Sequence, residues 1–418
     1  MFKSKKHNIY TGQISLKLFQ ICGLWKPLNC NSQWKLNIYY LYSIFTITLY
    51  ISLTFLLFVY MFQIHEDVKD FTQSVFYFST YFNVLIKLSM VVIRRDIFIK
   101  SNKMLLSDMC QSRDNHEVEI IKKCSDIGRA NTIRFLIFVH ITPITMLLVP
   151  LLSNKRRALP HELWLPFSVE AESVYILTYL YQTICLIMIL YISVGMEGLA
   201  LTVMLHICGQ LEIIKYRLSL LPELVKNNKF NPIKFSYEEE IIKCCIKSHL
   251  YIYSIGENVN KQFGLIIFTQ FFASIVNMCA IIYNMASVSP TNRMFWIMMA
   301  SIGSYVLQIF IYCYYGDKMT EKSSEISSAI YSLNWDALSV NTQKSLITIM
   351  IRSTRPIKLT ASSIIIMSIE TFMKVSIIFL FYLLLDIWIA QKLETSLESS
   401  HGNLVASFFT TWIVSISQ

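Results

Sequence analysis

Charged residues are scarce in this sequence. Asp, Glu, Lys and Arg make up only 15% of its 418 residues, whereas 54% are hydrophobic; a typical soluble domain has about a quarter of its residues charged. The mean hydropathy is +0.47. This composition excludes an ordinary soluble domain and favours a membrane protein.

The sequence also lacks the motifs of common enzymes and metal sites. It contains no Gly-rich phosphate loop, no His-Glu-x-x-His and no Gly-x-Ser-x-Gly, and its 8 histidines are dispersed. The 10 cysteines show no metal-binding or redox spacing, and Cys244 and Cys245 are directly adjacent. We therefore expect no enzymatic activity, no cofactor and no metal site.

Signals of secretion are missing as well. Residues 1–37 hold 6 lysines and no continuous apolar core, so we expect no cleavable signal peptide. No Asn-x-Ser/Thr site for glycosylation occurs anywhere in the chain. The first apolar segment is therefore expected to start membrane insertion itself.

Long apolar runs are what the sequence does contain. Each is about 20 residues or more, enough for a helix to cross roughly 30 Å of hydrocarbon. They predict transmembrane helices at residues 38–62, 71–93, 133–152, 174–205, 263–287, 295–315 and 359–385. The fourth run exceeds the need of a bilayer, so its helix should tilt or project beyond the membrane. We predict an all-α membrane protein with seven transmembrane helices.

The basic residues predict the orientation of these helices. The N-terminal segment and the second, fourth and sixth loops hold 29 Lys and Arg, and the remaining loops with the C-terminal tail hold 6. Only the cluster Lys155-Arg156-Arg157 argues against this asymmetry. The positive-inside rule thus predicts a cytoplasmic N-terminus and an extracellular C-terminus. The net charge of +10 is dispersed among loops, so no nucleic-acid partner is expected.

Four ionisable residues lie within the predicted spans, where charges are costly unless paired or hydrated. Lys87 either reaches the headgroups at the inner end of its span or pairs with another group. Glu197 lies in the inward half of the long fourth span. Glu370 and Lys374 are four residues apart, so they can pair locally or shape an ion pathway near a pore.

Aromatic and methionine side chains are concentrated in the outer halves of the second, third, fourth and sixth spans. Such residues line pockets for small apolar ligands, but they also serve helix packing and interfacial belts. Both interpretations stay open from composition. The candidate ligand-binding residues are Phe78, Tyr81, Phe82, Met146, Tyr175, Tyr179, Trp296, Met299 and Tyr305.

A short amphipathic segment precedes the first span. Ile14, Leu18, Ile21 and Trp25 recur at helical spacing beside Lys17. This pattern is typical of a helix on the inner leaflet, or of a helix packed on its own cytoplasmic loops.

The stretch from Gln308 to Trp335 resembles the sixth span and following loop of insect odorant receptors. Matching residues are Gln308, Cys313, Gly316, Ser323, Ser324, Ala329, Tyr331 and Trp335, followed by a basic and apolar segment to Lys358. Supporting matches are Gly23-Leu24-Trp25, the Glu197 region through His206 and Gln210, and His249 with Asn260 and Phe263. Together they extend over most of residues 14–374.

The resemblance implies a function and a set of partners. Insect odorant receptors are odorant-specific subunits of ligand-gated, non-selective cation channels that work as heteromers with a shared co-receptor, so a heterotetramer is expected. The implied ligand is a small volatile apolar molecule, and the implied location is the plasma membrane of an olfactory neuron dendrite, in contact with membrane lipid. No G protein is expected, since the N-terminus is cytoplasmic and rhodopsin-like motifs are absent.

The resemblance also implies a division of the chain. Residues 1–37 form a cytoplasmic segment with the interfacial helix, and 38–315 form six spans that bind the ligand. Residues 316–358 form a cytoplasmic anchor for subunit contacts, with Tyr331 and Trp335. Residues 359–385 form a seventh helix that lines the pore, near Glu370 and Lys374. Residues 386–418 are an atypical tail.

The chain departs from the family pattern after Lys374. The family continues into a short pore helix with a Ser-Tyr-Ser-like run, whereas this chain continues Val375-Ser-Ile-Ile-Phe. Val375-Ser376 can be encoded by a splice-donor sequence, so we hypothesise that residues 375–418 are translated intron. If they are genuine, the function of the pore is in doubt.

Two other functions stay open at this point. The related gustatory receptors share the topology, although the segment from Cys313 to Trp335 favours the odorant class. A secondary transporter is the other alternative, but the two halves of the chain show no inverted repeat and few buried charges.

Overall fold

The computed structural model describes residues 12–26, 32–64, 68–152, 158–227, 234–286, 288 and 293–394. The Lys155-Arg156-Arg157 cluster, the start of the predicted cytoplasmic segment and the end of the predicted atypical tail lie outside these residues.

The described chain is almost entirely helical, as predicted. Its helices are α1 Gln13–Ile21, α2 Gln33–Gln63, α3 Val68–Ile93, α4 Arg95–Leu105, α5 Asn115–Val139, α6 Ile141–Leu152, α7 Glu172–Asn227, α8 Lys234–Ala286, α9 Arg293–Tyr331, α10 Val340–Ser353 and α11 Ile369–Glu394, with 3-10 turns η1 Asp108–Cys110 and η2 Trp335–Ala337. A small antiparallel hairpin joins β1 Thr360–Ala361 to β2 Ile365–Ile366.

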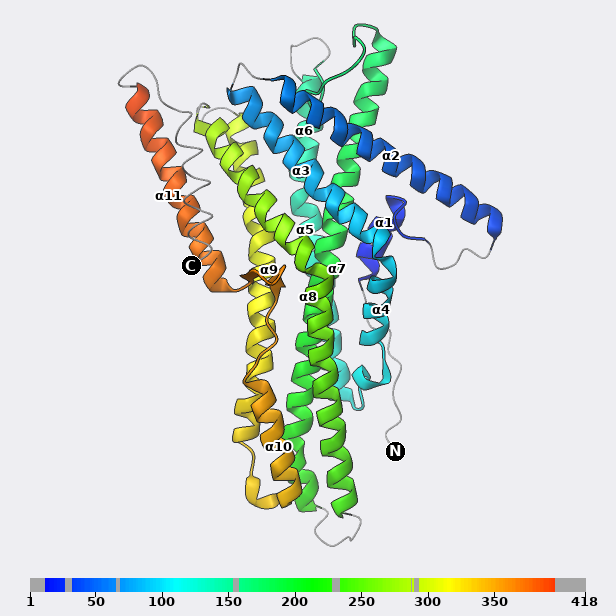
Figure 1. Ribbon diagram of the computed structural model, residues 1–418, viewed down its shortest axis with the longest axis vertical. Helices are drawn as coiled ribbons and strands as arrows, with labels where there is room; N and C mark the ends of the chain where they lie inside the picture. Colours follow the sequence, from blue (N-terminus) through cyan, green and yellow to red (C-terminus); the bar gives the residue numbers. More distant parts are fainter. Residues whose placement is uncertain are drawn as a thin grey trace.

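Three long helices form the axis of the molecule. In Figure 1, α7, α8 and α9 run nearly parallel to the long axis, while α2 and α3 cross obliquely at one end and α10 packs at the other. The helix α7 has 56 residues, roughly 84 Å at 1.5 Å per residue. The prediction that the fourth span extends beyond a bilayer as continuous helix is confirmed.

Six helical segments of the described chain are long and apolar enough to cross a membrane. They are Gln33–Gln63, Val68–Ile93, Asn115–Leu148, Glu172–Pro222, Glu238–Ala286 and Met294–Tyr331, and they correspond to the first six predicted spans. The main hydrophobic core lies where α3, α7, α8 and α9 pack together. The long apolar runs of the sequence are therefore sufficient to place these helices.

The third predicted span, residues 133–152, is not one straight helix. The chain breaks at His140 between α5 and α6, and the His140 ring nitrogen Nδ1 lies 2.6 Å from the carbonyl oxygen of Leu136. Pro143 follows in the first turn of α6, where its missing N–H costs little. The interruption is one residue, whose φ and ψ of −66° and −22° remain helical, and α6 contacts α9 and α7.

The predicted seventh span begins ten residues too early. Residues 360–366 form the β1–β2 hairpin, and the helix begins only at Ile369. Ser362 and Ser363 have positive φ angles of 51° and 62°, which helical backbone does not allow. The Ser368 hydroxyl then accepts a hydrogen bond of 3.2 Å from the Thr371 N–H and caps the helix.

The hairpin packs against the backbones of α8 and α9. The Ser362 N–H donates to the carbonyl oxygen of Gly264 on α8 at 3.1 Å. A Cβ atom at Gly316 on α9 would lie 2.6 Å from the carbonyl oxygen of Met367, closer than atoms can approach. Glycine at position 316 thus permits the close approach that fixes the start of α11.

The amphipathic N-terminal segment forms α1, which packs against α7 and α5. Leu18 and Trp25 are buried, while Ile21 is 55% exposed. The helix therefore packs on the protein, with the bundle helices rather than loops as its partners. Its location on the inner leaflet stays a prediction.

Candidate ligand cavity and buried polar network

A cavity of about 110 Å³ lies between helices of the bundle, at the middle of α3, the last third of α8 and the first half of α9. Its wall comes from α3, α5, α6, α7, α8, α9 and the loop before α7. The lining residues are Phe76, Tyr77, Thr80, Tyr81, Asn83, Val84, Val139, Thr142, Pro143, Met146, His161, Leu186, Ile189, Leu190, Ser193, Gln270, Asn277, Ser301, Ser304, Tyr305 and Gln308. The surface of this wall is mainly apolar, as in most small-molecule sites, although ten of the 21 lining residues have polar side chains other than tyrosine.

Three of the nine predicted ligand-binding residues line this cavity: Tyr81, Met146 and Tyr305. They come from α3, α6 and α9, so the structure brings together residues that are more than 200 positions apart. Tyr81 is buried, and its backbone carbonyl accepts a 2.9 Å hydrogen bond from the Tyr50 hydroxyl of α2. Their positions are compatible with direct contact to a ligand.

The other six predicted residues lie outside the cavity wall. On α3, Phe78 and Phe82 stack on each other with ring centroids 5.5 Å apart, one position away from the cavity-lining Tyr77 and Tyr81. Because each residue of a helix is rotated by about 100° from the last, this single step points the rings to another side. The remaining four are Tyr175, Tyr179, Trp296 and Met299.

These four side chains have other surroundings. The hydroxyls of Tyr175 and Tyr179 donate to the carbonyl oxygens of Ala158 and Leu147, at 3.1 and 2.5 Å. Trp296 is 65% exposed and Met299 is 38% exposed. Exposed aromatic and apolar side chains at a helix end are typical of a membrane-interface belt.

The loop between α6 and α7 closes one side of the cavity through His161. Its ring nitrogen Nε2 lies 2.8 Å from the Tyr81 hydroxyl, and its backbone N–H and carbonyl are both bound by the Gln182 side chain, at 2.9 and 3.1 Å. Burial lowers the pKa of His161 to about 3, so the ring is neutral near pH 7. This residue was not predicted from the sequence, because an isolated histidine in a loop belongs to no periodic pattern or motif.

Beyond the cavity, four helices meet at a buried ion pair. The Lys87 ammonium of α3 donates to Glu197 Oε1 of α7 at 2.8 Å, and the two side chains are 0% and 4% exposed. Lys87 also donates to Gln270 Oε1 of α8, whose amide nitrogen donates to Gln308 Oε1 of α9. Of the two interpretations of Lys87, pairing is the one observed.

The ion pair is joined to the cavity wall. Asn83, Gln270 and Gln308 line the cavity and belong to the same hydrogen-bonded network as Lys87 and Glu197. The Asn83 amide donates to Gln270 Oε1 at 2.8 Å. A polar stripe in the fifth apolar run, at Gln270 and positions 274 and 277, was the available sequence signal, because these residues share one helical face.

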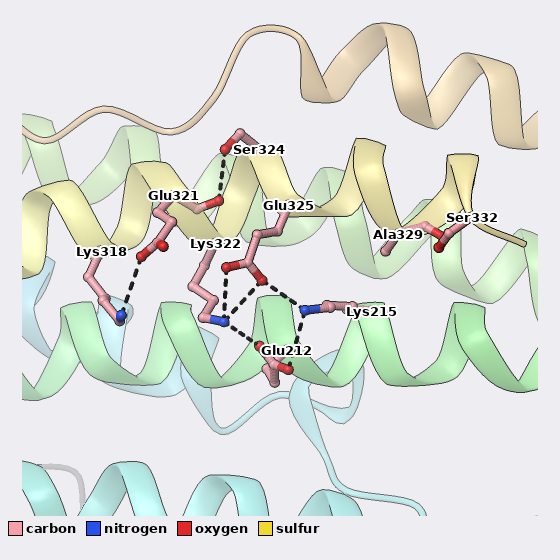
Figure 2. Close-up of polar contacts among 9 residues, drawn as sticks. All are labelled: Glu212, Lys215, Lys318, Glu321, Lys322, Ser324, Glu325, Ala329 and Ser332. Atoms are coloured by element: carbon pink, nitrogen blue, oxygen red, sulfur yellow. Dashed lines mark hydrogen bonds and ion pairs between the residues drawn. The ribbon is translucent and has the colours of Figure 1, made fainter.

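At the opposite end of the molecule, ion pairs join α7 to α9. Lys215 lies 2.8 Å from Glu325, and Lys322 lies 2.9 Å from Glu212 and 3.0 Å from Glu325. Figure 2 shows these side chains interleaved between the two helices, with Lys318 and Glu321 further along α9. They are partly exposed, so their main effect is to hold the two long helices in register rather than to add much stability.

Of the remaining predicted residues, Tyr331, Glu370 and Lys374 are exposed, whereas Trp335 is half-buried against the main hydrophobic core. In the predicted anchor, Tyr331 is 78% exposed, and the Trp335 indole donates to the Tyr331 carbonyl at 3.3 Å. Glu370 and Lys374 form a 3.2 Å ion pair in the first turns of α11, with side chains 78% and 73% exposed. Within the described residues, no three His, Cys, Asp or Glu side chains converge as metal ligands would.

Comparison with known proteins identifies related chains. Odorant receptor 9a of Drosophila melanogaster is 23% identical over 198 residues, covering 47% of this chain and 48% of the relative. Odorant receptor 46a, isoform A, of the same insect is 23% identical over 245 residues, covering 57% of this chain and 63% of the relative. The matches thus span about half to under two thirds of these relatives' lengths.

Solved structures share the fold. The insect olfactory receptor OR5 from Machilis hrabei in complex with eugenol superposes with a TM-score of 0.78 at 16% identity, over 90% of this chain and 97% of that one. A second structure of OR5 from Machilis hrabei superposes with a TM-score of 0.77 at 17% identity, over 89% of this chain and 96% of that one. This likeness confirms the predicted helical membrane fold.

The family itself follows from a sequence model. A model described as "7tm Odorant receptor" matches residues 67–377, which is most of the chain. A receptor family of this kind agrees with the expectation that the chain is not an enzyme. The chain belongs to the 7tm odorant receptor family, and it is a multi-pass membrane protein.

Proposed function

We propose that this chain is an odorant receptor, the odorant-specific subunit of a ligand-gated, non-selective cation channel formed with the odorant receptor co-receptor. The observation that supports this best is the cavity of about 110 Å³, whose wall surface is mainly apolar. An apolar protein cavity of about 150 Å³ binds benzene, so this one suits a small volatile molecule. The similar OR5 chain was solved in complex with eugenol.

In this proposal Tyr81, Met146 and Tyr305 contact the odorant, together with His161 from the closing loop. Most of the binding free energy then comes from apolar contact, and the polar wall groups set the orientation. The six predicted residues outside the wall contribute through helix packing or at the membrane interface.

The polar network offers a route from ligand to pore. Gln308 lines the cavity and is bound through Gln270 to the Lys87–Glu197 pair, so a ligand that displaces α9 must rearrange these bonds. The same helix α9 holds the β1–β2 hairpin at Gly316, and the hairpin leads directly into α11. Opening requires that the odorant bind more tightly to the open arrangement than to the closed one.

Exposed apolar side chains support the predicted subunit contacts. In residues 316–358, Tyr331, Val340 and Ile351 are 78%, 64% and 66% exposed, in a part of the chain that we place in the cytoplasm. Large exposed apolar groups outside a membrane mark contact surfaces. We assign them to the anchor that joins this subunit to its co-receptor partners in a heterotetramer.

The helix α11 is assigned to the pore. Its residues Met373, Ile377 and Leu380 are 55%, 63% and 54% exposed, and of the described helices α11 packs mainly on α9 and α8. A row of apolar side chains beside the Glu370–Lys374 pair fits an apolar gate near a charged mouth.

The orientation and location complete the proposal. The N-terminus lies in the cytoplasm and the C-terminus outside, in the plasma membrane of an olfactory neuron dendrite. Signalling then proceeds by cation flow through the receptor itself, without a G protein.

Expression with and without the co-receptor tests this function. Odour-evoked currents from a panel of small volatiles should appear only when both chains are present in one cell. Currents that do not need the co-receptor, or substrate uptake without conductance, would overturn the proposal. Surface labelling of the chain in both conditions separates a failure to conduct from a failure to reach the membrane.

The end of the chain remains a separate hypothesis. We hypothesise that residues 375–418 are translated intron; the family match runs to residue 377, so residues 378–418 lie beyond it. The part from residue 395 onward lies outside the described residues. Sequencing the transcript across codon 374 should reveal a spliced message, and a continuous reading frame in abundant message would sink the idea.

A further inference from the structure

A three-residue polar cluster in the cavity wall has a definite hydrogen-bonding direction. The Thr80 hydroxyl of α3 donates to its own helix, at the Phe76 carbonyl oxygen 2.9 Å away. The same oxygen lies 3.1 Å from the Tyr305 hydroxyl of α9 and accepts from the Asn277 amide of α8 at 3.0 Å. A threonine hydroxyl has one hydrogen and two lone pairs, so Tyr305 must be the donor to Thr80.

This assignment leaves acceptors in the wall. The Tyr305 hydrogen is used on Thr80, and the Tyr305 oxygen also shares a side-chain hydrogen bond with Asn277, so this oxygen has one lone pair left to accept another bond. The Asn277 oxygen Oδ1 is buried and has no partner, and neither has Asn83 Oδ1, although both residues are more than nine-tenths buried. Turning the Asn277 amide around would not help, because Thr80 has no hydrogen left to donate.

Two serines of α9 also offer acceptors to the cavity. The hydroxyls of Ser301 and Ser304 each donate to a carbonyl oxygen of their own helix, at Ile297 and Ala300, both at 3.0 Å. They too present lone pairs rather than hydrogens to the cavity that they line. The wall formed by α8 and α9 is therefore rich in acceptors.

We infer that this receptor selects small apolar molecules that bear one hydrogen-bond donor, a hydroxyl or an N–H, which binds Asn277 Oδ1 and the Tyr305 oxygen. The inference rests on the proposed function, since it names the ligand class of the same cavity. A buried acceptor without a partner is costly, and a donor on the ligand removes that cost. A hydrocarbon of equal size fills the cavity but leaves Asn277 Oδ1 unpaired.

Matched ligands test the inference. Benzyl alcohol has a donor, benzaldehyde has only an acceptor, and toluene has neither, while all three have similar size. In cells that express the chain with its co-receptor, the half-maximal concentration for benzyl alcohol should be about tenfold lower than for the other two. If toluene matches benzyl alcohol, or if benzaldehyde is preferred because donors such as the Tyr77 hydroxyl decide, the inference is wrong.

Two variants locate the effect. Asn277→Leu keeps the branched shape and the number of heavy atoms of the side chain but removes the acceptor, so the advantage of benzyl alcohol over toluene should fall to less than about threefold. Tyr305→Phe removes a single oxygen and should act in the same direction if the leucine variant fails to fold. Asn284→Leu is the control, since Asn284 is buried on the same helix, bonds to the Ala280 carbonyl and the Thr72 hydroxyl, and does not line the cavity.

The outcomes also separate this inference from the proposed function. If none of the ligands, nor a broad panel of volatiles, evokes a current in surface-expressed receptor, the channel proposal fails. If currents arise but Asn277→Leu shifts all three ligands equally, the channel proposal stands and the donor preference is refuted.

Discussion

Replacing Lys87 with methionine removes one half of the buried ion pair and keeps the length of the side chain. Lys87 and Glu197 are 0% and 4% exposed, and their charged atoms lie 2.8 Å apart. The variant leaves the Glu197 carboxylate buried without its cation. Breaking such a pair costs about 3–5 kcal/mol, more than a hundredfold in the ratio of folded to unfolded protein.

The double variant Lys87→Met/Glu197→Leu provides the decisive comparison. It replaces both charges with apolar groups, which is often neutral for a buried pair, so most of the lost stability should return. The assay is the thermal unfolding midpoint of the purified chain in detergent, with the fraction of chain at the cell surface as a second measure. The single variant should unfold at a much lower temperature than either the wild type or the double variant.

A surface ion pair supplies the control. Lys318 lies 3.3 Å from Glu321, but its side chain is 43% exposed, so Lys318→Met should cost less than about 1 kcal/mol. If Lys87→Met lowers the stability no more than this control does, or if the double variant is as unstable as the single one, the buried pair does not organise the bundle.

Three further predictions concern the hairpin, the cavity and its closing loop. Gly316→Ala should destabilise the chain by at least about 2 kcal/mol in the same thermal assay, because the new Cβ would lie 2.6 Å from a backbone carbonyl oxygen. Gly303→Ala on the same helix is the control and should be neutral, since its Cβ meets nothing nearer than 3.7 Å. Equal effects of the two substitutions would contradict the close approach. Tyr81→Ala and Tyr305→Ala should change the ranking of odorants in current recordings more than surface expression, and unchanged ranking in both would assign these rings to packing. Burial lowers the pKa of His161 to about 3, so the closed loop loses stability as the pH falls below about 6.5, the pKa of histidine in the unfolded chain. Between pH 7.5 and 5, ligand responses should therefore weaken in the wild type but not in His161→Gln. A pH response shared by both would refute the role of the ring.

Most of the fold follows from the sequence by simple physical rules. A bilayer demands apolar helices of a minimum length, so the positions of six spans could be predicted from hydropathy alone. The seventh boundary could not, because the hydropathy of residues 359–368 does not reveal the hairpin. The hairpin depends instead on particular residues: Ser362 and Ser363 with positive φ, the cap at Ser368, and the glycines at positions 264 and 316 that let the hairpin approach two helices.

The cavity was predictable only in part. Aromatic and methionine content indicated the right half of the bundle, and Tyr81, Met146 and Tyr305 do line the cavity. The choice between neighbours such as Tyr81 and Phe82 depends on helix rotation, which tertiary packing sets. Likewise, Lys87 and Glu197 are 110 positions apart, so no local pattern could pair them.

A structure of the receptor complex with a bound odorant tests the central claim most directly. We expect ligand density in the cavity among α3, α6, α7, α8 and α9, in contact with Tyr81 and Tyr305. In the open channel we also expect a changed arrangement of Gln308 and the Lys87–Glu197 pair. Density for the ligand at another site, with this cavity and network unchanged between closed and open channels, would contradict it.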